Sequence, residues 1–180
     1  MRSCGRDCLR RAAGELLRRR VAAQVDLGIH AKELELASIT HTLNPDTGDL
    51  REELLHFGQR LLAALYSPEA IAIRRLAIAE SRHSNIGKIV FEGATLPIEK
   101  QVAEFLRKAM KRGALRTADP KTAAIQLLSL LESELLQRVL LGVVSSVKPE
   151  ALNSAARRAV ETFLFGYGRR DARFARVMSR

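Results

Sequence analysis

Apolar residues recur at intervals of three and four positions through most of the chain, which is the spacing of an amphipathic α-helix. The stretch from position 50 to position 65 shows this most clearly, with apolar side chains at Leu50, Leu54, Phe57, Leu61, Leu62 and Leu65. Alternating apolar and polar runs between hairpin turns, the pattern of β-strands, are sparse. The pattern therefore predicts an all-α fold with about six helices.

Proline and capping residues indicate where several of these helices begin. Ser67 with Pro68, and Asp119 with Pro120, each place an N-cap side chain directly before a proline in the first helical turn. The segment LNPDTGDL at positions 43–50 combines Asn, Pro, Asp and Gly, which favours a turn. We therefore expect one helix to follow this turn and others to begin at the two prolines.

Two further breaks are predicted in the middle of the chain. The segments SRHSNIGK (81–88) and EGATLPIEK (92–100) are rich in residues that interrupt helices. A short helix ending at Phe91 is expected between them. The helix that follows extends to Gly113 and carries one apolar stripe, formed by Val102, Phe105, Leu106 and Met110.

The last two predicted helices, over residues 123–144 and 150–167, differ in how their apolar residues are distributed. The first is apolar around most of its circumference, so it must be buried on more than one side. The second carries a single apolar stripe. Two such helices from each of two copies would cover one another in an isologous four-helix interface. A wholly intramolecular core explains the same pattern, and the pattern alone does not separate these alternatives.

Charged residues inside the apolar helices require an explanation. Arg74 and Arg75 are expected to stay in water, on the outer side of the helix that begins at Pro68. Glu132 and Glu134 lie in the leucine-rich helix, where a charge must be paired, hydrated or at the edge of a pocket. We interpret the two glutamates as part of a polar strip with Gln126, Ser129, Ser133 and Gln137.

The chain is strongly basic, with a net charge of +10, but the charge is concentrated at its two ends. Residues 1–20 contain seven Arg and two acidic residues, and residues 169–180 contain five Arg and one acidic residue. Residues 21–168 contain 18 basic and 17 acidic residues. A nucleic-acid-binding domain places its positive charge on a structured face, which a nearly neutral middle does not provide.

The basic segment LRRAAGELLRRR (residues 9–20) can form a helix with one short apolar side. Its arginines could contact phosphates, lie on a membrane surface or extend the following helix, and we favour a solvated or loosely helical extension of the chain. Cys4 and Cys8 would need two more ligands to hold zinc, and His30, His41, His56 and His83 lack the spacing of a zinc finger. No metal site and no cofactor are therefore predicted.

Catalytic motifs and membrane-spanning segments are also missing from the sequence. There is no glycine-rich phosphate loop, nucleophile elbow, His-Glu-x-x-His or paired-carboxylate pattern, and SRHS (81–84) suggests no third catalytic group. No apolar run approaches the roughly 18 residues that a spanning helix needs. Two cysteines with three residues between them do not make a disulfide framework. We expect a cytoplasmic protein that is not an enzyme and has no membrane partner.

Three segments together resemble the C-terminal, ligand-binding and dimerisation domain of TetR/AcrR-type bacterial transcriptional regulators. Particularly telling is the order G-A-L-R-x-x-D-P-x-x-A-A (113–124) leading into a leucine-rich helix. The ending F-G-Y-G (165–168) is similar to that of the AefR-like branch. The carrying segments are LLAALYSPEAIAIRRLAIAE (61–80), VAEFLRKAMKRGALRTADPKTAAIQLLSLL (102–131) and FLFGYGRR (163–170).

The resemblance implies a division of labour. The C-terminal helices of such regulators hold a small effector in an apolar pocket and form a homodimer through the last two helices, while an N-terminal helix-turn-helix binds DNA. For the pocket, the residues expected on this basis are Leu61, Leu65, Phe91 and Phe105. For the dimer interface, they are Leu127, Leu131, Leu135, Val139, Ala156, Val160 and Phe163.

The DNA-binding unit of that family has no counterpart in the sequence, because only twenty residues precede Val21. We therefore expect a basic extension over residues 1–20, an effector and dimerisation domain over 21–170, and a basic tail over 171–180. DNA would be a partner only through a helix-turn-helix supplied by a relative or by lost upstream sequence. The alternatives are a protein that heterodimerises with intact relatives, and a weak non-specific nucleic-acid binder acting through its basic head.

Overall fold

The computed structural model describes residues 28–44 and 49–169, and every regular element within them is a helix. The all-α prediction is confirmed, while the predicted basic segments at residues 1–20 and 171–180 lie outside the described residues. A helical segment over residues 28–41 comes first. It is followed by α2 (Leu50–Leu65), α3 (Pro68–Glu80), α4 (Ile86–Val90), the π-helix η1 (Phe91–Thr95), α5 (Leu96–Lys111), α6 (Pro120–Glu132), α7 (Leu136–Leu140) and α8 (Pro149–Tyr167).

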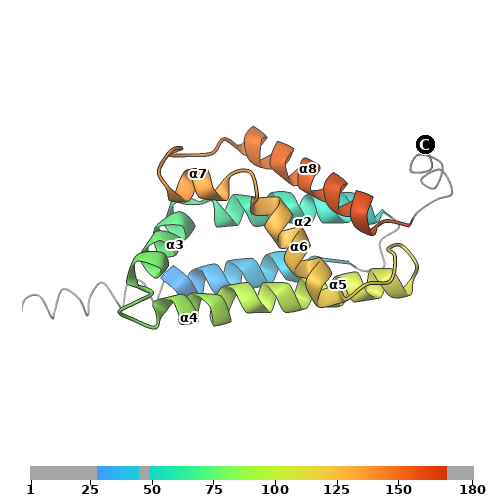
Figure 1. Ribbon diagram of the computed structural model, residues 1–180, viewed down its shortest axis with the longest axis horizontal. Helices are drawn as coiled ribbons and strands as arrows, with labels where there is room; N and C mark the ends of the chain where they lie inside the picture. The colour runs from blue at the N-terminus through green and yellow to red at the C-terminus, as the bar shows by residue number, and fades with distance from the viewer. Residues whose placement is uncertain (1–27, 45–48, 170–180) are drawn as a thin grey trace, which may run out of the picture.

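The helices form two layers joined by crossing helices (Figure 1). Helices α2 and α8 run side by side in one layer, and the segment over 28–41 runs beside α4 and α5 in the other. Helix α6 crosses between the layers and packs against both α5 and α8. The most deeply buried side chains lie where these helices meet, among them Leu62, Leu106, Leu127 and Phe163.

The N-caps expected from the sequence form as predicted. Ser67 Oγ accepts a hydrogen bond from the Ala70 amide at the start of α3. The Asp119 carboxylate accepts from both the amide and the hydroxyl of Thr122 at the start of α6. The hydroxyl bond from Thr122 is the main reason why the pKa of Asp119 is lowered. These caps fix the directions in which α3 and α6 leave their loops.

The predicted break over residues 92–100 is wrong, because α4, η1 and α5 form one continuous helical path. Pro97 was expected to end the helix, since it has no amide hydrogen and its ring clashes with the carbonyl four residues earlier. Directly before Pro97, the Leu96 amide donates to the Phe91 carbonyl, five residues back. This wider π-turn changes the local hydrogen-bond register, so the proline is accommodated within the helix.

The single helix predicted over residues 123–144 is also wrong, because α6 ends at Glu132 and the short α7 follows after a turn. The hydroxyl and the amide of Ser133 both donate to the Leu130 carbonyl, which tightens the last turn. Gly142 has a φ of 74° and ends α7. The break allows α7 to pack against α3, where Arg75 donates to the Val139 carbonyl at 2.5 Å.

The two sequence motifs at 113–124 and 165–168 lie against each other in the structure. The Arg116 amide donates to the Tyr167 carbonyl at 2.8 Å, and Arg116 Nε donates to the Gly166 carbonyl at 2.7 Å. The guanidinium of Arg116 also lies 4.6 Å from the centre of the Tyr167 ring. The loop before α6 therefore satisfies carbonyl groups at the C-terminal end of α8.

Candidate functional site

A cavity of about 210 Å³ lies between the segment over 28–41 and helices α2 to α6. Its wall is mostly apolar, with Ile29, Leu36, Leu61, Ala64, Leu65, Ala70, Ile73, Val90, Ala94, Ile98, Ile125 and Leu128. The polar residues of the wall are Lys32, Arg74, Thr95, Glu99, Ser129 and Glu132. An apolar cavity with a few polar groups is the usual form of a small-molecule site. A cavity of about 150 Å³ already holds benzene, so this one has room for a ring with a substituent.

Helical spacing brings the cavity residues together. Leu61 and Leu65 are four residues apart on α2, so they lie on the same face. Ile125, Leu128, Ser129 and Glu132 follow the positions i, i+3, i+4 and i+7 of α6. This second face of α6 was not assigned from the sequence, although its spacing was a signal that could have revealed it.

An ion pair joins α3 to α6 on the cavity wall. Arg74 Nη1 donates to Glu132 Oε1 at 2.5 Å, and the side chains are only 23% and 21% exposed. Arg74 was expected to remain in water, and this expectation is wrong because its guanidinium turns inward to reach Glu132. Glu134, which we placed in the same polar strip, instead pairs with Arg158 on α8, and hydrogen bonding from Arg158 lowers the pKa of Glu134.

Tyr66 directly follows α2 and contributes a buried hydroxyl group near this ion pair. Its side chain is 9% exposed, and within the described part of the chain the hydroxyl has no hydrogen-bond partner. Burial raises the pKa of Tyr66, the Glu132 carboxylate raises it further, and Arg74 lowers it. The phenol therefore keeps its proton at neutral pH.

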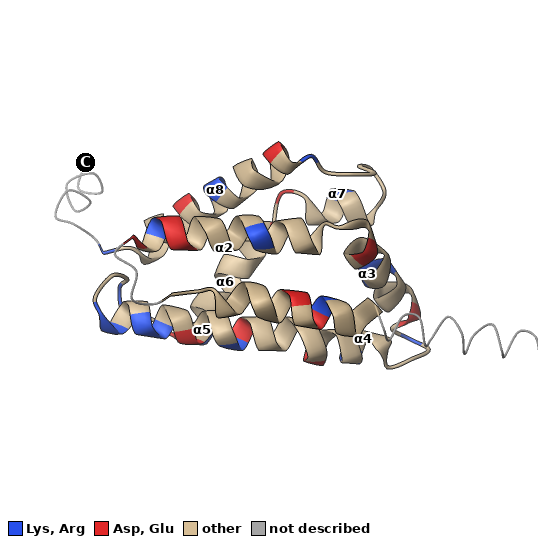
Figure 2. Ribbon diagram, turned by 180° about the vertical axis from the view of Figure 1, so that it is seen from behind, with Lys and Arg blue, Asp and Glu red and all other residues tan. Residues whose placement is uncertain are grey.

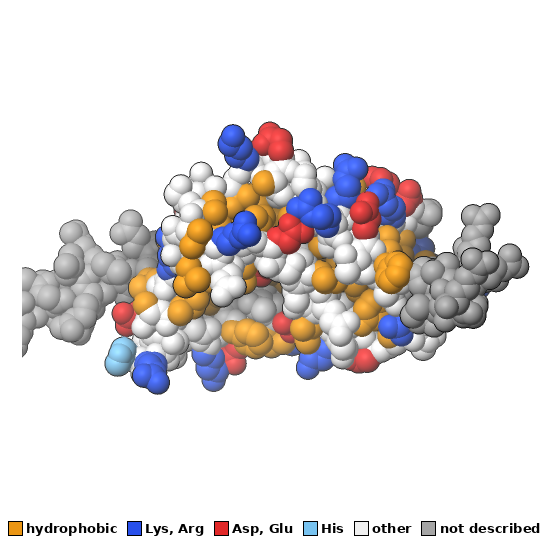
Figure 3. All heavy atoms as spheres, turned by 45° about the horizontal axis from the view of Figure 1, so that its top comes forward, with side chains coloured by type: hydrophobic (Ala, Val, Ile, Leu, Met, Phe, Trp, Pro, Cys, Tyr) orange, Lys and Arg blue, Asp and Glu red, His pale blue; other side chains and the backbone are white. Residues whose placement is uncertain are grey.

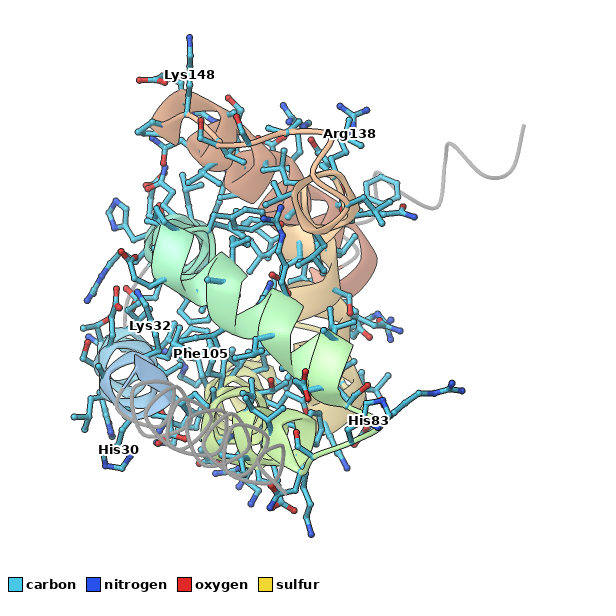
Figure 4. All side chains as sticks on the ribbon, turned by 90° about the vertical axis from the view of Figure 1, so that its left-hand side faces the viewer. His30, Lys32, His83, Phe105, Arg138 and Lys148 are labelled. Carbon is cyan, nitrogen blue, oxygen red and sulfur yellow. The ribbon has the colours of Figure 1, made fainter. Side chains whose placement is uncertain are left out.

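The opposite wall of the cavity is formed by the segment over 28–41 and by α5. Lys32 belongs to this wall, and its Nζ also donates to Glu35 at 2.6 Å. Figure 4 shows Lys32 turned toward the interior and His30 turned away from it. Glu99 stands on the α5 side of the cavity. The whole cavity wall thus carries two cationic side chains, Lys32 and Arg74, and two anionic side chains, Glu99 and Glu132.

A second, more open groove of about 660 Å³ lies between α3, α6 and α7. Its wall includes Ile78, Leu136, Leu140 and Leu141, together with Ser129 and Glu132. Ser129 and Glu132 also line the inner cavity. The Arg74–Glu132 pair therefore lies at the boundary between the inner cavity and the outer groove.

Only two of the four residues expected in the pocket lie on this wall. Leu61 and Leu65 line it, as described above. The assignment of Phe91 to this pocket is wrong, because Phe91 is the first residue of η1 and is 49% exposed. The assignment of Phe105 to this pocket is wrong as well, because Phe105 lies further along α5, is 3% exposed within the core, and borders a separate groove beside His41.

The residues expected at the dimer interface are mostly buried within the single chain. Leu135 is half-buried, and the remaining six are at most 3% exposed: Leu127, Leu131, Val139, Ala156, Val160 and Phe163. Side chains buried within one chain leave no surface for a second copy, which corrects this assignment. These residues form the intramolecular core that the sequence left open.

Other site types find little support among the described residues. In residues 28–44 and 49–169, no group of three or more His, Asp, Glu or Cys could hold a metal ion. His30 and His56 are 77% and 71% exposed, and Cys4 and Cys8 lie outside the described residues. Within the same ranges, none of the helices combines the length and the apolar character needed to cross a membrane.

Comparison with solved structures shows which known proteins this chain is similar to. A search of solved structures finds a TetR-family transcriptional regulator of Mesorhizobium loti MAFF303099, with a TM-score of 0.69, 25% identity, and coverage of 82% of this chain and 71% of that one. A TetR regulator of Agrobacterium tumefaciens matches with a TM-score of 0.57 and 29% identity, covering 66% and 60%. The flavonoid-responsive regulator FrrA matches with a TM-score of 0.64 over 92% and 87%, and its 24% identity supports the fold alone.

A search of curated proteins finds no match. A family model does match residues 52–169, and it describes the C-terminal domain of AefR-like transcriptional repressors. This match spans α2 to α8 and therefore includes most of the cavity wall. The chain belongs to the TetR-type transcriptional regulators, in the family of AefR-like C-terminal domains.

Proposed function

We propose that the chain is the effector domain of a transcriptional regulator and binds a small apolar or amphipathic molecule in the inner cavity. The cavity carries the proposal, because it is mostly apolar, is bounded by the segment over 28–41 and the helices from α2 to α6, and has a few polar groups in its wall. In the proposed mode of action, the protein works in the cytoplasm as a homodimer, and DNA binding is supplied from outside the described residues.

The dimer would use the outer faces of α6 and α8, joined by the short α7. Large apolar side chains are exposed directly after α7, with Leu141 at 71% and Val143 at 73%, and near the end of α8, with Phe165 at 71%. Figure 3 presents apolar side chains over α7 and α8, interspersed with charged ones. A twofold arrangement would bring each such patch against its own copy, as in an isologous interface.

The cavity and the proposed interface share helix α6. Ile125 and Glu132 face the cavity, whereas Gln126 is exposed on another side of the same helix. An effector that binds two arrangements of α6 unequally would therefore shift the geometry of the dimer. This coupling would let an occupied cavity change the separation of attached DNA-binding units.

Binding in the cavity is tested by titrating the protein with methylcyclohexane, an apolar molecule of single-ring size, and following the thermal unfolding midpoint. We expect the midpoint to rise, because a ligand that binds the native state stabilises it. Leu65→Phe, which adds volume at the cavity wall, should abolish the rise. Leu34→Phe is the matched control, because Leu34 is 67% exposed and does not border the cavity. A wild-type midpoint that does not respond refutes the cavity assignment for this class of molecule.

The dimer is tested by size-exclusion chromatography with light scattering at micromolar concentration. The wild type should have twice the mass of one chain, and Phe165→Arg should shift it toward the monomer. Leu34→Arg introduces the same charge at another exposed apolar site and should remain dimeric. A monomeric wild type would overturn the proposed assembly.

A further inference from the structure

The Tyr66 hydroxyl has no hydrogen-bond partner among the described residues, although it is buried. An unpaired buried hydroxyl destabilises a fold, and each such group requires an explanation. Glu132 and Arg74 are the charged groups that act on this phenol. Both belong to the wall of the cavity to which we assign effector binding.

The ion pair beside Tyr66 has unused hydrogen-bonding capacity. Arg74 and Glu132 share one hydrogen bond, from Nη1 to Oε1. Glu132 Oε2 accepts no hydrogen bond from any other residue in the described ranges, and a guanidinium has five N–H donors. The Tyr66 hydroxyl is therefore a donor, and the second Glu132 oxygen an acceptor, that has no partner within the described ranges.

The charges on the wall constrain the ligand. Both cations of the wall are already paired, Lys32 with Glu35 and Arg74 with Glu132, so an anionic ligand would enter a largely apolar cavity without an unpaired cation to meet it. A neutral ligand with a hydrogen-bond-accepting oxygen avoids this cost. Such an oxygen can bond to Arg74 without altering the charge balance.

We propose that the effector is a neutral, largely apolar molecule with a carbonyl or hydroxyl oxygen, and that its binding transfers Glu132 from Arg74 to Tyr66. The ligand oxygen accepts a hydrogen bond from Arg74, and the Glu132 carboxylate turns to accept the Tyr66 hydroxyl. The buried Tyr66 hydroxyl then gains a partner, while Arg74 and Glu132 each keep one. The inference rests on the proposed function, because it assumes that the cavity binds the effector.

This exchange gives effector binding a structural consequence. In the described state, the Arg74–Glu132 pair connects α3 to α6 across the boundary between cavity and groove. When Glu132 turns to Tyr66, the connection of α6 moves to the end of α2. The ligand thereby weakens one helix contact and strengthens another, which is the differential interaction that a switch requires.

The test compares four probes of similar size: cyclohexanone, methylcyclohexane, cyclohexanecarboxylate and cyclohexylammonium. Binding is measured by calorimetry on the full chain. Cyclohexanone should bind more tightly than methylcyclohexane and more tightly than both charged probes. Tyr66→Phe should weaken cyclohexanone binding by about threefold to tenfold, as expected for one net hydrogen bond, and leave methylcyclohexane unaffected.

Stability separates this role from a purely structural one. Tyr66→Phe removes an unpaired buried hydroxyl, so the unfolding midpoint should stay the same or rise. The matched control is Tyr167→Phe, because the Tyr167 hydroxyl donates to Gln126 Oε1. That variant should lose stability and keep its affinity for cyclohexanone.

A spectroscopic signature follows from the composition, since the chain has two tyrosines and no tryptophan. In the Tyr167→Phe background, tyrosine fluorescence reports on Tyr66 alone. Cyclohexanone should quench this emission, because a phenol that donates to a carboxylate loses fluorescence, and Glu132→Gln should remove the quenching. Methylcyclohexane is the control for occupancy without a polar group and should not quench.

The outcomes are distinguishable. Equal affinity for cyclohexanone and methylcyclohexane, tighter binding of a charged probe, or unchanged cyclohexanone affinity in Tyr66→Phe overturns the inference while leaving the cavity as a ligand site. A marked loss of stability in Tyr66→Phe also overturns it, because the hydroxyl would then have a partner already. If none of the four probes binds the wild type, the proposed function fails, and the inference fails with it.

Discussion

Gly58 on α2 lies where α2, α6 and α8 approach one another, and replacing it with alanine tests how closely these helices pack. A Cβ atom at this position would lie 2.8 Å from Leu131 Cδ2 on α6 and 3.5 Å from Ala156 Cβ on α8. Leu131 and Ala156 are both fully buried. The leucine methyl group must therefore shift within a fully buried environment to admit the new Cβ atom.

Two effects of opposite sign decide the magnitude. Alanine is favoured over glycine inside a helix by about 1 kcal/mol. Overpacking a well-packed core costs about 1–3 kcal/mol. The contact to Leu131 is closer than real Cβ contacts, so the packing cost should exceed the helix gain. We expect Gly58→Ala to lower the free energy of unfolding by about 1 kcal/mol.

The assay is urea unfolding followed by circular dichroism, in which ΔG is extrapolated to water and the m value is compared between variants. Gly166→Ala on α8 is the matched control, because a Cβ there would meet nothing within 4 Å. That variant should leave stability unchanged or raise it by up to about 1 kcal/mol. If Gly58→Ala is as stable as the control variant, the close approach of α2 to α6 and α8 is refuted.

Three other substitutions test separate parts of the structure by the same unfolding assay. Arg116→Ala removes the side-chain bond to the Gly166 carbonyl and the contact with the Tyr167 ring, so it should cost about 1 kcal/mol, and unchanged stability would contradict this contact. Asp119 has a pKa below its ordinary value of 3.8, so its stabilising effect is complete above that pH and is lost as the pH falls through the lowered pKa. Asp119→Asn should therefore reduce the dependence of stability on pH in acid, which a pH series of unfolding curves would measure. Leu62 is fully buried, so Leu62→Ala should cost about 2–5 kcal/mol, whereas Leu34→Ala at an exposed site should change stability by less than about 0.5 kcal/mol.

The Arg74–Glu132 ion pair was harder to predict than the helix caps, because it depends on a contact between two helices that are far apart in the sequence. Ser67 and Asp119 act on backbone amides three residues away, so local sequence is enough to identify them. Arg74 and Glu132 are 58 residues apart and meet only after α3 and α6 have packed on α2 and α5. From the sequence, Arg74 resembled any exposed arginine. For Glu132, pairing and a pocket edge were two of the options considered, and both apply.

The two wrong helix boundaries have a related origin. Proline and glycine near position 97 indicate a break, but a π-turn at η1 keeps the path helical. Conversely, the leucine-rich run after Pro120 has no proline or glycine until Gly142, yet the helix ends at Glu132. Packing of α7 against α3 favours this end, and that contact is not encoded in local propensity.

The basic ends and the neutral middle were visible from composition alone, and Figure 2 shows acidic and basic residues interspersed along most described helices. Lys108 and Lys111 lie near the end of α5, where cations are favourable for a helix C-terminus. Other charged side chains form ion pairs, such as Arg107 with Glu104 and Arg158 with Glu134.

The sequence by itself determined the helical class, the N-caps at Ser67 and Asp119, and the ordered motifs that resemble the TetR-type effector domains. These properties depend on residues within a few positions of one another, or on the order of such segments. Tertiary structure alone decided which face of α6 lines the cavity, which apolar residues are core rather than surface, and that Arg74 meets Glu132 beside Tyr66. The physical reason is that burial, pairing and cavity shape are properties of several helices packed together, and no single helix contains them.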